Sequence, residues 1–90
     1  MNRRRAPAVP RVGDSVLVRS IPEAARKLPV ATRRAFRLAI GHQFKVRSRN
    51  RVGWLELYVG RVVSGISPYL ESIWIEPACV RVVRRGKRAA

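Results

Sequence analysis

The segment Lys45–Gly60, KVRSRNRVGWLELYVG, has the residue pattern of a β-hairpin. Its first arm carries a cation at every second position: Lys45, Arg47, Arg49 and Arg51. Its second arm instead has aliphatic side chains at every second position: Leu55, Leu57 and Val59. Because neighbouring side chains of a strand point to opposite faces, this period of two predicts strands with one apolar and one polar face. The hairpin therefore predicts a sheet with an aliphatic core side and a basic outer side.

The same alternation holds for the remaining residues of the hairpin, on either side of a turn at residues 49–53. In the first arm, the positions between the cations are occupied by Phe44, Val46 and Ser48. In the second arm, Glu56 and Tyr58 lie opposite the aliphatic side chains, and we expect both to face the basic row across the ladder.

Three further segments have the pattern of short strands: residues 12–19, 72–76 and 80–83. Between the first of these and the hairpin, residues 22–41 predict a helical insertion, which Pro29 interrupts and Gly41 ends. Toward its end, apolar side chains share one helical face by i, i+3 and i+4 spacing: Phe36, Ala39 and Ile40. We expect Phe36 and Ile40 to dock this helix onto the sheet.

These elements predict a mainly β fold with a helical insertion, in which five short strands curl into a small barrel with the helices between its first and second strands. Ninety residues make one small domain, which we place at residues 12–83. The segments 1–11 and 84–90 carry several cations and no acid, so we expect both to be disordered basic tails.

The charge balance of the chain is its most unusual property. Twenty Lys and Arg face only five Asp and Glu, which gives a formal net charge of +15. A GC-rich genome would explain the preference for Arg over Lys, but it would not explain the scarcity of acids. Such an excess repels itself in the folded state, and a polyanion such as nucleic acid would relieve that repulsion.

The sequence also predicts a compartment. A single cysteine, Cys79, allows no disulfide within the chain, which favours a reducing environment. No apolar stretch follows the N-terminal cations as in a secretory signal, and no run approaches the ~20 apolar residues that span a bilayer. We therefore expect a cytoplasmic protein without a membrane partner.

The chain resembles the Src-homology-3-like small barrels, the superfold that also holds KOW, Tudor and Sm-type modules. The resemblance rests on VGDSVLV at residues 12–18, FKV at 44–46, GWLELYV at 53–59 and SIWIEPACVRVV at 72–83. The chain is also similar to small uncharacterised bacterial proteins with this strand order and an inserted helical stretch. The insertion departs from the minimal barrel, where that connection is a plain loop. Proteins of this superfold bind peptides, methyl-lysine, DNA or RNA, so the resemblance implies a binding module without naming its ligand.

Residues for catalysis are scarce. His42 is the only histidine and Cys79 the only cysteine; we expect His42 to follow a helix end and Cys79 to pack as a small hydrophobe. No cluster has metal-ligand spacing, and no glycine-rich loop is of the kind that cradles phosphates. We therefore expect no enzyme activity, no metal and no cofactor.

The candidate binding residues are cations and aromatics. From Arg26 to Arg51 there are nine Lys or Arg and no acid, and side chains two apart on a strand are separated by ~6.6–7 Å, comparable to the spacing of successive phosphates. The candidate phosphate-binding residues are Arg33, Arg34, Arg37, Lys45, Arg47, Arg49, Arg51, Arg84 and Arg85. Four aromatics either cap the core or offer an exposed surface for stacking: Trp54, Tyr58, Tyr69 and Trp74. Three of them lie opposite the aliphatic strand faces and form the candidate stacking or partner platform: Trp54, Tyr58 and Trp74.

The sequence thus predicts a nucleic-acid-binding protein that contacts phosphates with low sequence specificity. The alternative is an interaction module, or accessory subunit, that docks an acidic protein partner in a larger complex. The pattern does not distinguish DNA from RNA, and it leaves the oligomeric state open.

Overall fold

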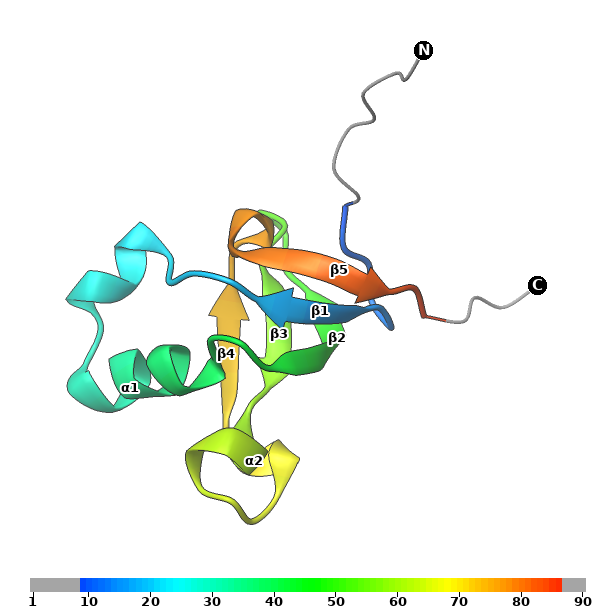
Figure 1. The fold of residues 1–90 in the computed structure, drawn as a ribbon. Helices are drawn as coiled ribbons and strands as arrows, with labels where there is room; N and C mark the ends of the chain where they lie inside the picture. Colours follow the sequence, from blue (N-terminus) through cyan, green and yellow to red (C-terminus); the bar gives the residue numbers. More distant parts are fainter. Residues whose placement is uncertain (1–8, 87–90) are drawn as a thin grey trace.

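The computed structural model describes residues 9–86, which form one antiparallel sheet flanked by short helices (Figure 1). The strands are β1 (Ser15–Val18), β2 (Gln43–Arg49), β3 (Leu55–Tyr58), β4 (Ser72–Ile75) and β5 (Val80–Arg84). They pair in the order β4-β3-β2-β1-β5. The mainly β fold with five strands is confirmed, as an open sheet with β4 and β5 at its edges.

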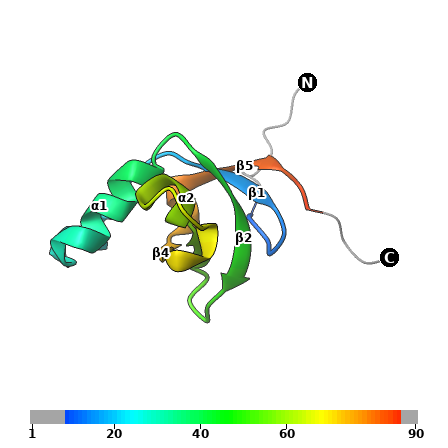
Figure 2. The same cartoon turned by 90° about the horizontal axis from the view of Figure 1, so that it is seen from below.

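The helices are short, and the two α-helices lie together. They are α1 (Val30–Ala39), α2 (Gly60–Val63) and the 3-10 turns η1 (Glu23–Lys27), η2 (Pro68–Leu70) and η3 (Pro77–Cys79). Helix α1 packs against α2, η1 and β4 (Figures 1 and 2). The two α-helices therefore lie away from the described ends of the chain next to β1 and β5, whereas η3 connects β4 to β5 (Figure 1).

Strand β2 connects the two halves of the sheet. Its first residues pair with β1, where Lys45 faces Ser15, and its later residues pair with β3, where Val46 faces Leu57. The strand curves strongly along its length (Figure 2). The register shifts at Arg47, which is the extra residue of a β-bulge. A bulge bends its strand locally, and such a bend allows one strand to pair with both halves of the sheet.

The core is formed by the faces that the alternation predicted. The side chains of Leu55, Leu57 and Val59 are fully buried, and those of Val16 and Val18 are buried with them. The core cluster also contains Cys79, which packs as the small hydrophobe that the sequence predicted.

The helical insertion is confirmed, with one correction. Pro29 separates η1 from α1, and Gly41 adopts a positive φ of 85° while its N–H donates to the Val18 carbonyl at 2.9 Å. Phe36 is buried as predicted, but Ile40 is 41% exposed, so the expectation that Ile40 docks the helix is wrong. The helix ends at Ala39, and the non-helical ψ of 132° at Ile40 takes its side chain off the helical face.

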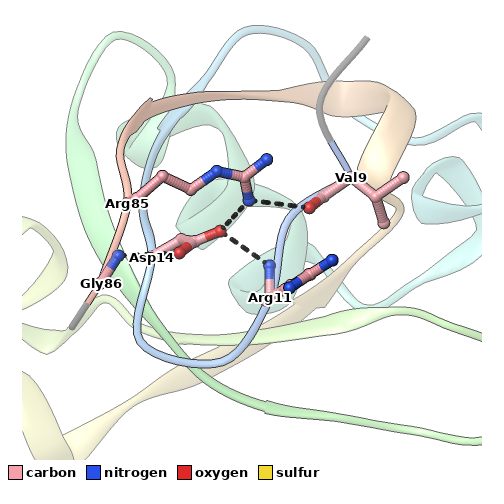
Figure 3. A network of polar contacts seen from close by, with 5 residues as sticks. All are labelled: Val9, Arg11, Asp14, Arg85 and Gly86. Atoms are coloured by element: carbon pink, nitrogen blue, oxygen red, sulfur yellow. Dashed lines mark hydrogen bonds and ion pairs between the residues drawn. The ribbon is translucent and has the colours of Figure 1, made fainter. Parts of the chain in front are cut away.

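The described ends of the chain meet at a buried aspartate (Figure 3). Asp14 is fully buried and accepts hydrogen bonds from Arg85 Nη1 at 2.7 Å, the Gly86 N–H at 2.8 Å and the Arg11 N–H at 3.0 Å. Arg85 Nη1 also donates to the Val9 carbonyl at 3.1 Å. A Cβ on Gly86 would overlap the backbone of Gly13, so a glycine is needed for this close approach.

This network extends the folded domain beyond the predicted boundaries. The sequence placed residues 84–90 in a tail, whereas β5 continues to Arg84 and Asp14 binds Arg85 and Gly86. At the other end, Pro10 is buried. The remaining parts of the predicted tails, residues 1–8 and 87–90, lie outside the described residues.

Candidate nucleic-acid interface

The outer face of β2, β1 and β5 carries a row of side chains from three strands. Ser15 is paired with Lys45 on one side and with Arg84 on the other, so all three side chains point to the same face. Since neighbouring strands lie ~4.8 Å apart, the two cations have Cα atoms roughly 10 Å apart. Both are exposed, and with Arg85 they line a hollow of about 380 Å³.

The bulge in β2 changes the predicted row of cations. Strict alternation would place Lys45, Arg47 and Arg49 on one face. After the bulge, however, Ser48 faces Glu56 on the outer side, and Arg49 faces Leu55, whose side chain is in the core. The expectation that Arg49 continues the row is therefore wrong.

Arg49 and Arg51 lie at the hairpin turn instead. The guanidinium of Arg49 lies beside Gly53, where a Cβ would be 3.8 Å from Nη2. Arg51 is an exposed residue of the turn itself. The predicted row thus reduces to Lys45 and Arg47.

Arg47 belongs to a cluster of cations and aromatic rings. Its Cζ lies 5.1 Å from the centroid of the Tyr58 ring, and the ring of Tyr69 meets Tyr58 edge-on, with centroids 5.4 Å apart and an interplanar angle of 76°. These contacts are a cation–π pair and a T-shaped aromatic pair. They form one wall of a second hollow of about 470 Å³, called here the tyrosine hollow.

The tyrosine hollow is cationic and aromatic. Beside the residues just described, its lining includes Lys45, Arg61, His42 and Phe44. None of the described residues that line it is acidic. Glu56 lies on the same face of the sheet, but its Oε1 accepts a hydrogen bond from Ser48 Oγ at 2.8 Å. Lys45 lines both hollows, so a basic surface runs from Arg61 to Arg84.

The cations of α1 lie elsewhere. Arg33 and Arg37 line a third hollow of about 270 Å³ with Arg26 and Glu23, and this hollow shares no residue with the other two. Arg26 forms a 3.4 Å ion pair with Glu23. Arg33 is half-buried, and its Nε is buried without a hydrogen-bond partner among the described residues, while Arg34 is exposed. The structure divides the predicted basic region into two parts.

Three more predicted residues have the following surroundings. Arg85 is bound by the buried carboxylate of Asp14, so its charge is matched within the chain. Trp54 is half-buried beside the hairpin turn, where its backbone N–H donates to Asn50 Oδ1 at 2.9 Å. Trp74 is 38% exposed and faces Glu56 across the β3–β4 ladder.

The sequence reasoning missed Arg61 as a site residue, and it did not place Tyr69 beside Tyr58 in the platform. Gly60 is buried, and a Cβ there would overlap the Ser67 carbonyl, so this glycine allows the segment after β3 to fold back. Ser67 Oγ then accepts from the Tyr69 N–H at 3.3 Å. The Ser67-Pro68 pair indicates the start of a turn, but no sequence signal indicates that this turn places Tyr69 against Tyr58.

Neither a metal site nor a membrane span is found in residues 9–86. This part of the chain holds no group of three or more His, Cys, Asp or Glu side chains placed to bind a metal ion. None of its helices combines the length and apolar character that a bilayer requires.

Comparisons with known proteins identify no relative. No protein-family model matches the sequence, and neither the curated proteins nor the solved structures include a match. The function is therefore argued from the surface itself.

Proposed function

We propose that this chain is a non-enzymatic nucleic-acid-binding protein that contacts phosphates through the outer face of β2, β1 and β5, with low sequence specificity. The observation that carries the proposal is the basic surface from Arg61 to Arg84, whose two hollows share Lys45 and have no acidic residue among the lining residues that the structure describes. Phosphate contacts of this kind position a protein on nucleic acid without reading its sequence.

We also propose that the sheet belongs to the Src-homology-3-like class of small barrels. The strand order, the strongly bent β2 shared between two halves, and the single 3-10 turn η3 before the last strand support this assignment. An experimental structure in which β4 and β5 diverge without closing the barrel would contradict it.

The proposal predicts that affinity for nucleic acid depends on which cations lie on the outer face of β2, β1 and β5, and not only on the net charge of the chain. Replacing both Lys45 and Arg47 by Gln should weaken binding to every nucleic acid tested, since both side chains are exposed and lie on the proposed contact surface. Each lost phosphate contact should flatten the plot of log affinity against log salt by ~0.7–0.9, because fewer counterions are released. Fluorescence anisotropy titrations at several salt concentrations measure both quantities.

The matched control removes the same two charges elsewhere. Lys27 and Arg34 are exposed on the helical insertion and line none of the three hollows, so their double Gln variant should bind more tightly than the first variant. Equal losses in both variants would show that only net charge matters. A parent protein that binds no nucleic acid at low salt would overturn the proposed function.

Exposed aromatics favour a second candidate function. Tyr69 is 70% exposed and Trp74 is 38% exposed, which fits a module that docks an acidic protein partner. Competition separates the two functions: polyglutamate should displace an oligonucleotide only weakly if the surface is a nucleic-acid site. Displacement at matched charge concentration would favour the protein partner.

A further inference from the structure

We infer that the tyrosine hollow holds an unpaired base of a single-stranded nucleic acid, with Tyr69 as the stacking surface. The inference rests on the proposed function and adds the class of nucleic acid. It follows from the volume and lining of the hollow, from the contacts that hold Tyr69 in place, and from the cations around the hollow and the Tyr69 ring.

The hollow has a suitable size and chemistry for a base. Its volume of about 470 Å³ lies in the range of roughly 300–1,000 Å³ that small-ligand pockets occupy. Its aromatic wall consists of Tyr58 and Tyr69, and aromatic rings stack on any of the four bases because each base has a π-face. Base stacking of this kind is tolerant of sequence, in agreement with low specificity.

Tyr69 is both supported and accessible. Its backbone N–H is held by Ser67 Oγ, and its ring is held against Tyr58, which also contacts the guanidinium of Arg47. Nevertheless, 70% of Tyr69 is exposed to solvent. A ring that is already positioned loses little conformational freedom when a ligand stacks on it.

The cations around the ring favour a polynucleotide over an uncharged ligand. Lys45, Arg47 and Arg61 surround the aromatic wall, so a base in the hollow would have its flanking phosphates next to positive charge. A base in a duplex is stacked between its neighbours and cannot offer its face to Tyr69. The hollow should therefore contribute to single-strand binding and contribute little to duplex binding.

The test compares Tyr69→Ala and Tyr69→Phe on a short single-stranded oligonucleotide and on the duplex of the same sequence. Tyr69→Ala should weaken single-strand binding roughly 5- to 150-fold, the effect that removal of a stacking aromatic typically has. It should leave duplex binding nearly unchanged. Tyr69→Phe retains the ring and should bind like the parent. Ile66→Ala, an exposed residue of the same segment outside the hollow, is the matched control and should have no effect.

An abasic single strand isolates the base contact. It has the same phosphates without bases, so it should bind the parent more weakly than the normal strand, and Tyr69→Ala should not weaken it further. Ribose and deoxyribose oligonucleotides of one sequence then determine whether the strand is RNA or DNA. Circular dichroism checks that each variant is folded.

The outcomes separate the two proposals. If Tyr69→Ala binds the single strand like the parent, or loses single-strand and duplex binding equally, the inference is overturned while phosphate binding by this surface stands. The same holds if the abasic strand binds as tightly as the normal one. If the parent binds neither form, both proposals fail.

Discussion

Replacing Phe36 by alanine is expected to lower the free energy of unfolding by about 3–5 kcal/mol. Phe36 is 2% exposed and belongs to the core cluster, and it lies on α1, which packs against α2 and β4. The variant would lose the burial of an aromatic ring and leave a cavity between the helices and the sheet. Chemical denaturation monitored by circular dichroism measures the change.

Ile40→Ala is the matched control for this prediction. Ile40 lies on the same insertion but is 41% exposed, so its replacement should cost less than ~1 kcal/mol. The sequence had assigned both residues the same role, and the two variants therefore test the corrected end of α1. A loss below ~1 kcal/mol for Phe36→Ala would mean that the helix contributes little to the isolated domain.

Replacing Asp14 by alanine is expected to cost about 2–4 kcal/mol. The change removes a fully buried carboxylate that accepts hydrogen bonds from Arg11, Arg85 and Gly86 (Figure 3). Hydrogen bonds to a charged group are stronger than neutral ones, but the side chain of Arg85 is 49% exposed and regains water when its partner is lost. The expected cost is therefore lower than for a fully buried pair.

A double-mutant cycle identifies the contact responsible. Arg85→Ala leaves a buried carboxylate with fewer donors, whereas the double variant with Asp14→Ala removes both groups, so the double variant should cost less than the sum of the single ones. Additive costs would show that the ion pair contributes nothing. Glu23→Ala is the matched control, because its ion pair with Arg26 is exposed on both sides and should contribute less than ~1 kcal/mol.

Part of the candidate site could be derived from the sequence because it depends only on local alternation. Lys45 and Arg47 were predicted on the outer face, and both are exposed there. Tyr58 was predicted on the same face, and it lies under the guanidinium of Arg47. Tyr69 was weighed as a stacking aromatic, but its position beside Tyr58 was not predicted, because that position depends on how the segment after β3 folds back.

By itself, the sequence determined which strand faces form the core and which residues divide and end the helical insertion. Alternation assigned Leu55, Leu57 and Val59 to the interior, and Pro29 and Gly41 divided and ended the insertion. These are properties of neighbouring residues, since side-chain direction along a strand and the backbone limits of proline and glycine act within a few positions.

Only the tertiary structure decided the register of β2 and the contacts between distant segments. The bulge at Arg47 arises where one strand pairs with both β1 and β3, and it turns Arg49 away from the outer face. The contacts of Tyr69 with Tyr58 and of Arg85 with Asp14 join residues far apart in the chain. The physical reason is that register and long-range pairing minimise the energy of the whole sheet, which no short stretch of residues encodes.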